Sequence, residues 1–237
     1  MTKLDKTARL TFMLLLLSAP CKTYAQGGDV AGNIHVSEVT GSAKRISLAN
    51  VVLWLTPLDA SLVTPIPKQH VRLVQKNKEF NPHLLVIPTG TSVDFPNLDP
   101  FFHNVFSLFN GRRFDLGLYE AGSHRSVSFD REGVSYIFCN IHPEMGAVVV
   151  SLRSPYYAVS SSDGSFVVHD VPPGRYRIQT WAEQLQPVSP DEPARIVQVT
   201  AKGASLGALN FVSGVDALAH HKNKFGKDYS SPQPPQY

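Results

Sequence analysis

A cysteine, a histidine and a methionine lie close together in the run Phe138-Cys139-Asn140-Ile141-His142-Pro143-Glu144-Met145. Once residues 1–25 are set aside, Cys139 is the only cysteine of the chain and Met145 its only methionine. A short loop that offers a thiolate, an imidazole and a thioether is typical of a copper site that alternates between Cu(II) and Cu(I). This loop therefore carries most of the functional information in the sequence.

A mononuclear copper site of this kind uses two imidazoles, one thiolate and a weakly bound axial thioether, so the loop lacks one imidazole. The best candidate is His103, which lies 36 residues before Cys139. We therefore predict one mononuclear copper ion held by His103, Cys139, His142 and Met145.

The pair of motifs resembles a known family. His103-Asn104-Val105 together with Cys139-x2-His142-Pro143-x-Met145 is similar to the cupredoxins, in particular to the short-loop amicyanin and plastocyanin-like proteins. The resemblance covers about ninety residues, 67–153, and implies a β-sandwich with type 1 (blue) copper at one end. It also implies that Asn104 makes a hydrogen bond that braces the ligand loop.

The resemblance further implies that His142 lies near the surface, with its ring edge among apolar residues. Phe101, Phe102, Pro100 and Pro143 are the expected members of that patch. A redox partner would dock there weakly, as transient electron-transfer contacts require. The amicyanin likeness suggests a methylamine-oxidation context, but the sequence names neither the electron donor nor the acceptor.

The loop residues also fit roles without copper. Cys139 is an odd cysteine, so it is a metal ligand, a buried inert thiol or an intermolecular link. Met145 could simply fill a gap in a core. Zinc is disfavoured because a thioether is a poor zinc ligand. A Cys–His nucleophile is disfavoured because no orienting third residue or oxyanion hole is evident nearby.

The remaining histidines are weaker candidates. His83 opens a predicted strand and is a minor candidate for a metal ligand. The surface histidines are predicted to be His35, His70, His124 and His169. The pair His220-His221 lies in a polar tail and is expected to bind metal only incidentally.

The N-terminus predicts export. A basic start is followed by an apolar stretch at 10–19 and a small-residue pattern that ends at Ala25, which is typical of a signal peptide cleaved after that residue. Cys21 follows a proline, which fits a lipid-attachment site poorly, so it is expected to be lost with the leader. The predicted location is the periplasm.

Charge and hydropathy exclude some classes of partner. Without residues 1–25 the chain has 18 basic and 18 acidic residues, so its net charge is near zero. No basic patch interleaved with aromatic residues supports nucleic-acid binding. No stretch approaches the roughly 20 apolar residues of a membrane-spanning helix.

The elements that must position the loop are predicted to be strands, because short Val/Ile/Leu/Phe runs alternate with Gly, Pro, Asn and Asp. The predicted strands are 29–37, 50–56, 70–75, 83–87, 92–95, 104–108, 125–129, 134–138, 147–152, 156–160, 166–170, 175–181, 195–200 and 206–211. About fourteen strands in roughly 185 residues fit two small sandwiches better than one.

The order of the motifs suggests that one sandwich is split by the other. A predicted two-residue hairpin turn at Asp163-Gly164 and the run Val171-Pro172-Pro173-Gly174-Arg175-Tyr176 resemble the transthyretin-like or carboxypeptidase-regulatory β-sandwich. The first strands of such a domain appear far upstream, near Gly28 and Asn50. We predict a split host sandwich at 26–60 plus 154–213, a copper domain at 61–153 and a disordered tail at 214–237, with tandem domains as the alternative.

The predicted function is periplasmic electron transfer rather than catalysis. Four protein ligands leave no open coordination position, and the chain lacks the His-x-His pattern of copper enzymes with additional centres. The alternative is an exported copper-binding module for storage or scaffolding, and a metal-free β-protein is a third hypothesis.

Overall fold

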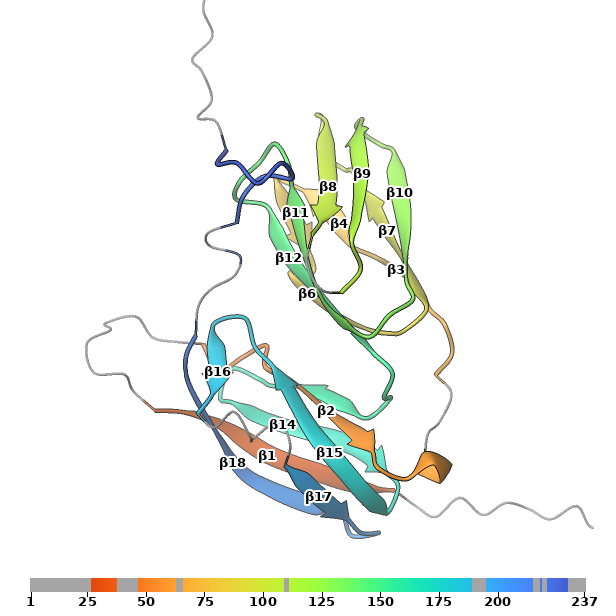
Figure 1. Cartoon of the computed structure of the whole chain (residues 1–237), viewed down its shortest axis with the longest axis vertical. Helices are drawn as coiled ribbons and strands as arrows, with labels where there is room; N and C mark the ends of the chain where they lie inside the picture. Colours follow the sequence, from red (N-terminus) through yellow and green to blue (C-terminus); the bar gives the residue numbers. More distant parts are fainter. Residues whose placement is uncertain are drawn as a thin grey trace, which may run out of the picture.

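The computed structural model describes residues 27–37, 47–62, 66–108, 111–188, 195–214, 218 and 221–229. Apart from one 3-10 turn at Ala60–Leu62, the regular structure of these residues is β-strand, which confirms the predicted all-β class. The strands form two sandwiches (Figure 1). The predicted signal peptide lies outside the described residues. Within the described ranges, no helix is long and apolar enough to span a membrane.

The first unit, here called the outer sandwich, has two four-stranded sheets in the orders β14-β1-β18-β16 and β13-β2-β15-β17. Its strands are β1 (Gly28–Val36), β2 (Val52–Pro57), β13 (Tyr157–Val159), β14 (Ser165–Val171), β15 (Gly174–Trp181), β16 (Leu185–Pro187), β17 (Ile196–Val199) and β18 (Ala204–Ser213). β1 pairs with β14 and β18, and β2 pairs with β13 and β15. Strands that are far apart in the sequence therefore complete the same two sheets.

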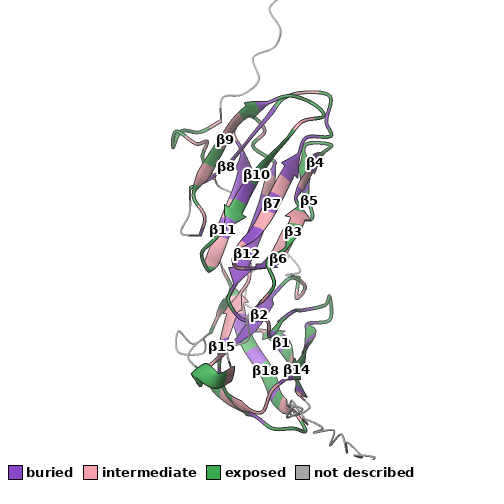
Figure 2. Cartoon of the chain, turned by 90° about the vertical axis from the view of Figure 1, so that its right-hand side faces the viewer, coloured by how far each residue is buried: buried purple, intermediate pink, exposed green. Residues whose placement is uncertain are grey.

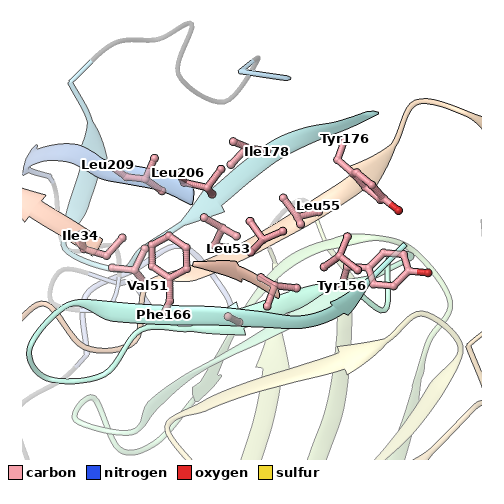
Figure 3. Packing of buried hydrophobic residues seen from close by; sticks show 14 of the residues in the cluster. Ile34, Val51, Leu53, Leu55, Tyr156, Phe166, Tyr176, Ile178, Leu206 and Leu209 are labelled. Atoms are coloured by element: carbon pink, nitrogen blue, oxygen red, sulfur yellow. The ribbon is translucent and has the colours of Figure 1, made fainter. Parts of the chain in front are cut away.

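The core of the outer sandwich forms between these sheets, because alternate residues of a strand point to the same face. Figure 3 shows side chains from both sheets meeting there: Ile34, Phe166, Leu206 and Leu209 from one, Leu53, Leu55, Tyr176 and Ile178 from the other. Burying an apolar side chain of this size contributes about 1.5–3 kcal/mol. The core therefore joins β1 and β2 to β13–β18, although about a hundred residues separate these two parts in the sequence.

The turn at Asp163-Gly164 forms, but it is not the hairpin turn that the sequence predicts. Gly164 has a φ of 83°, and its N–H donates to the Ser161 carbonyl at 2.9 Å. The strands on either side, β13 and β14, belong to opposite sheets. A glycine turn between hydrophobic runs thus predicts a chain reversal, but it does not determine whether the two strands pair.

The second unit, here called the inserted sandwich, lies between β2 and β13 in the sequence. Its strands are β3 (His70–Arg72), β4 (Val74–Lys76), β5 (Glu79–Asn81), β6 (Leu84–Pro88), β7 (Thr91–Pro96), β8 (His103–Ser107), β9 (Phe114–Tyr119), β10 (His124–Phe129), β11 (Gly133–Cys139) and β12 (Gly146–Leu152). The five-stranded sheet has the order β6-β12-β11-β8-β9 and faces the three-stranded sheet β10-β7-β3, while β4 and β5 form a hairpin. These sheets are consistent with a cupredoxin-like β-sandwich.

Strands β5, β9 and β16 are absent from the sequence prediction. In β9 the apolar run is interrupted by Gly117, which has a φ of 67°, and the β8–β9 register shifts between Asn104 and Phe106. A bulge of this kind adds a residue to one strand while the pairing continues beyond it. The alternation on which the prediction depends is lost at that point.

The two sandwiches pack against each other through β12. Its residues are buried on both faces, and they include Val148 and Val150, which cluster with Val52 and Trp54 of β2. The run Ala147-Val148-Val149-Val150 is therefore continuously apolar, as expected of a strand covered on both sides. Figure 2 shows buried residues of β12 and β2 where the two units meet.

The sequence predicts a disordered tail at 214–237, after β18. Leu218 and residues 221–229 are instead placed against the inserted sandwich, where His221 stacks on the Phe138 ring. A polar composition predicts disorder because such a segment cannot form a hydrophobic core of its own. The prediction does not consider that a few side chains of the segment can pack on the surface of a neighbouring domain.

Candidate metal centre

Two neighbouring strands bring the candidate ligands to one end of the inserted sandwich. β8 begins at His103, β11 ends at Cys139, and the two strands pair with Cys139 opposite Val105. The loop to β12 then supplies His142 and Met145. Since β8 and β11 run antiparallel, the first residue of one lies beside the last residue of the other. The 36-residue separation in sequence is thereby closed in space.

The ligand atoms form a tight group. The Nδ1 atoms of His103 and His142 lie 3.2 Å apart, and each lies 3.6 Å from Cys139 Sγ. A first-row metal bound at about 2.0–2.1 Å from nitrogen and 2.3 Å from sulfur separates its ligand atoms by roughly 3.3–3.6 Å in tetrahedral geometry. The spacing of the three side chains therefore fits a single metal ion. Among the described residues, the possible ligand atoms of His103, Cys139 and His142 all lie within 4.8 Å of one another.

Met145 lies in the same core as Cys139. Its side chain is fully buried in the hydrophobic cluster of the inserted sandwich. The loop backbone is compact: the Met145 N–H donates to the His142 carbonyl at 3.1 Å, and the Cys139 N–H donates to the Met145 carbonyl at 3.2 Å. The structure thus brings the fourth predicted ligand back beside the cysteine.

Asp99 holds His103 from the side away from the metal position. Its Oδ2 lies 2.9 Å from His103 Nε2, and both side chains are buried. The backbone N–H groups of Asn77 and Lys78 donate to the same carboxylate. Burial by itself raises the pKa of Asp99, but the hydrogen bonds from Lys78, His103 and Asn77 outweigh it, so the pKa lies below its ordinary value.

This carboxylate determines which nitrogen of His103 carries the proton. An ionised Asp99 accepts the proton of Nε2, which leaves the lone pair of Nδ1 directed toward Cys139 and His142. Asp99 is a candidate site residue that the sequence motifs did not predict. Its only signal in the sequence is an acidic residue four positions before the histidine.

The surroundings of Cys139 and His142 have different consequences for metal binding. Burial raises the pKa of the Cys139 thiol, while backbone N–H groups of Asn104 and Ile141 donate toward the sulfur and oppose this effect. Burial and the neighbouring His103 lower the pKa of His142, which favours the neutral imidazole. Since metal binding requires a thiolate and neutral imidazoles, the proton on sulfur is the one that a metal must displace.

Asn104 braces the ligand loop, but through its backbone. Its carbonyl accepts from the Asn140 N–H at 2.9 Å. Its side-chain Nδ2 donates instead to Asp115 Oδ1 at 2.7 Å and to the Gly117 carbonyl at 3.0 Å, both on β9. The expected connection to the loop is therefore present, and the side chain adds a second connection to the edge strand.

Aromatic and apolar residues cover the group on the outside. The Phe101 ring lies 5.3 Å from the His103 ring and 5.5 Å from the His142 ring, measured between centroids. Leu98, Phe102 and Ile141 are about half exposed in the loops around it. His142 itself is partly buried and lies next to Ile141 in this apolar surface.

The other histidines lie elsewhere. His83 Nε2 contacts Glu183 Oε2 at 2.7 Å, which links the two sandwiches and leaves His83 outside the group. Exposed positions are confirmed for His35, His70, His124 and His169. His220 lies outside the described residues, whereas His221 packs on the inserted sandwich.

Solved structures that are similar to part of this chain include copper proteins. A purple cupredoxin from Nitrosopumilus maritimus is 26% identical over 35% of this chain and 99% of its own length, with a TM-score of 0.32. A reduced mutant of amicyanin is 17% identical over 42% of this chain and 98% of its own, with a TM-score of 0.34. A Cu-containing nitrite reductase from Thermus scotoductus SA-01 is 24% identical over 41% of this chain but only 27% of its own length, with a TM-score of 0.34. No protein-family model and no curated protein matches the chain.

Proposed function

We propose that this protein is an electron carrier with one type 1 (blue) copper ion held by His103, Cys139, His142 and Met145. The observation that carries the proposal is the spacing of 3.2–3.6 Å among two imidazole nitrogens and one thiol sulfur. Met145, the sole methionine after residue 25, is buried in the core that contains the thiol. Bound copper would supply one-electron exchange between Cu(II) and Cu(I).

The chain's own contribution is to hold the donor atoms still. Asp99 keeps Nε2 of His103 protonated and its ring oriented. Phe101 lies against both imidazole rings. Four protein donors under such a cover leave no position for a substrate, whereas catalytic metal sites keep one open. We therefore propose a carrier rather than an enzyme.

Electron transfer would proceed through His142, which is the partly exposed member of the three clustered ligands. Around it lie Leu98, Phe102 and Ile141, with exposed fractions of 55%, 51% and 45%. An apolar patch of this kind suits weak, transient docking of a redox partner protein. In partner electron-transfer assays, Phe102→Ala should slow the bimolecular rate, whereas Ile196→Ala, equally exposed on the outer sandwich, should not.

The proposed location is the periplasm, reached by a signal peptide cleaved after Ala25. An oxidising compartment usually pairs its cysteines, so a single buried thiol that forms no disulfide among the described residues suits a metal ligand. The likeness of the outer sandwich to transthyretin-like domains and the methylamine-oxidation context stay predictions.

The first test is the visible spectrum of the protein titrated with Cu(II), beside Cys139→Ser and, as a control, Ser107→Ala. The proposal expects an intense thiolate-to-copper band that a mild reductant bleaches reversibly, and that Cys139→Ser lacks. Circular dichroism confirms that each variant is folded. A band that is present but lacks reversible reduction and fast self-exchange would favour the storage or scaffold module. A colourless protein would overturn copper binding through this loop.

A further inference from the structure

The C-terminal segment reaches the candidate metal centre from outside the sandwich. In Figure 1 its described residues, drawn in dark blue, lie beside the end of β11. Leu218 packs in the cluster between the two sandwiches, and residues 221–229 continue along the inserted one. Residues 221–229 therefore lie next to the strand that ends at Cys139.

One set of contacts joins this segment to β11. The His221 ring stacks on the ring of Phe138, with centroids 4.0 Å apart and planes at 10°. His221 Nδ1 donates to the Leu218 carbonyl at 2.8 Å. The Tyr229 ring lies 5.3 Å from the His221 ring, and its hydroxyl donates to the Cys139 carbonyl at 2.8 Å. A tail residue thus contacts the backbone of a proposed ligand directly.

A second set of contacts forms a closed ring of hydrogen bonds. The Lys224 N–H donates to Asn140 Oδ1 at 3.0 Å, and the Asn140 N–H donates to the Asn104 carbonyl at 2.9 Å. Asn104 Nδ2 donates to Asp115 Oδ1, and Lys224 Nζ contacts Asp115 Oδ2 at 2.8 Å. Asn104 and Asn140 each follow a proposed ligand. The ring therefore ties β8, β9 and β11 together at the level of His103 and Cys139.

We propose that residues 221–229 form a strap that positions the ligand loop, with Tyr229 and Lys224 as its positioning residues. The strap sets the distance between the His103 end of β8 and the Cys139 end of β11. It also covers the outer side of the Cys139 backbone. The predicted effect of the strap on copper release rests on the proposed function. The predicted effect on the opening of the ligand loop does not, because it is measured in metal-free protein.

The strap should keep the ligand spacing the same with and without metal. Beyond the end of β11 a few hydrogen bonds replace the regular ladder between strands, so local opening of the loop costs less free energy than opening of the sheet. Each of the two anchors adds one net hydrogen bond or ion pair to the closed arrangement. The Lys224–Asp115 pair is partly shielded, with exposed fractions of 21% and 42% for its side chains. Losing both anchors should raise the population of the open loop without unfolding either sandwich.

The test compares the full-length double variant Tyr229→Phe/Lys224→Met with a matched control on the outer sandwich, Tyr157→Phe/Lys202→Met. The control removes one exposed tyrosine hydroxyl and one exposed lysine charge away from the ring. The first readout is amide hydrogen exchange of Asn140 in metal-free protein, because this N–H bridges β11 and β8. The Ile178 N–H, bonded to the Arg195 carbonyl in the outer sandwich, serves as the internal reference.

The strap predicts exchange at Asn140 that is roughly two- to tenfold faster in the double variant, with Ile178 unchanged. In the Cu(II)-loaded protein, copper release to a chelator should accelerate by a similar factor and the thiolate-to-copper band should shift. Equal exchange at Asn140 in the double variant and the control would overturn the proposal. Equal acceleration at Asn140 and Ile178 would also overturn it, because the segment would then act on global stability. A protein that binds no copper would refute the proposed function but leave the exchange result to decide on the strap.

Discussion

His103 and Asp99 form a buried pair in which the carboxylate oxygen lies 2.9 Å from the imidazole Nε2. The hairpin between β4 and β5 holds the other side of this carboxylate through the N–H groups of Asn77 and Lys78. These two residues have φ values of 58° and 59°, the left-handed conformation that directs successive N–H groups to one side. A distant turn therefore orients a proposed metal ligand through one carboxylate.

The first prediction concerns this pair. Asp99→Asn keeps the size of the side chain but removes its charge, so the amide cannot hold the His103 proton as strongly. We expect copper affinity to fall about 10–100-fold, the range usual for partners that orient a ligand. The measurement is competitive titration against a chelator of known affinity.

The control for that prediction is Asp130→Asn. Asp130 lies on the same sandwich, and its 3.5 Å contact with Arg112 is exposed. This variant should bind copper as the parent chain does. Equal affinities for Asp99→Asn and Asp130→Asn would show that Asp99 does not orient the site.

The sequence predicts the candidate site better than it predicts the site's supports. His103, Cys139 and His142 stand out because their side chains are metal ligands at a spacing that paired strands bring together. Asp99 has only its position before His103 as a signal. Tyr229 has none, because its partner is a backbone carbonyl, and a carbonyl has no residue type that a sequence pattern reveals.

The fold shows the same division. The alternating run that became β14 is predictable because one face of it is buried in the outer core. β9 escapes prediction because Gly117 breaks its alternation. The contact between the sandwiches is hinted at only by the unbroken apolar run of β12. Local patterns therefore predict strands, whereas contacts between distant segments need the structure.

A second prediction separates packing from metal chemistry at Met145. Met145→Leu nearly conserves volume in a core and should cost less than about 1.5 kcal/mol of unfolding free energy. Met145→Ala leaves a cavity and should cost about 2–5 kcal/mol. Urea unfolding of the metal-free variants measures both values.

The same leucine variant tests the axial role. It should keep the thiolate-to-copper band but raise the reduction potential, because an apolar group in place of a donor disfavours the more highly charged Cu(II) state. Cyclic voltammetry of the loaded variant gives this value. A potential equal to that of the parent chain would remove Met145 from the ligand set.

A third prediction concerns the contact between the sandwiches. Val150 is fully buried in the cluster that contains Trp54, and Trp181, the only other tryptophan of the chain, packs against this cluster. Val150→Ala should cost about 1.5–3 kcal/mol and shift the tryptophan emission to longer wavelength. Val167→Ala, which is 40% exposed on β14, should change neither quantity measurably. Identical unfolding curves for the two variants would mean that the contact contributes no stability.

The last prediction concerns acid. Asp163 accepts hydrogen bonds from the Ser161 hydroxyl at 2.6 Å and from the Ser165 N–H at 2.9 Å, and these lower its pKa to about 2. In the unfolded chain the pKa of an aspartate is about 3.9, so between these values the unfolded state binds more protons. The contribution of Asp163 is therefore complete above the unfolded pKa and is lost as the pH falls from about 4 to 2.

Asp163→Asn removes this titration. The parent chain should be more stable than the variant at pH 6, and the difference in unfolding free energy should shrink steadily as the pH falls from 4 to 2. Asp130→Asn, measured in the same series, corrects for the loss of one surface charge. Urea unfolding at pH 6, 4, 3 and 2 gives the required values. A difference in unfolding free energy that stays constant over this range would mean that the hydrogen bonds do not stabilise the ionised form of Asp163 over its protonated form.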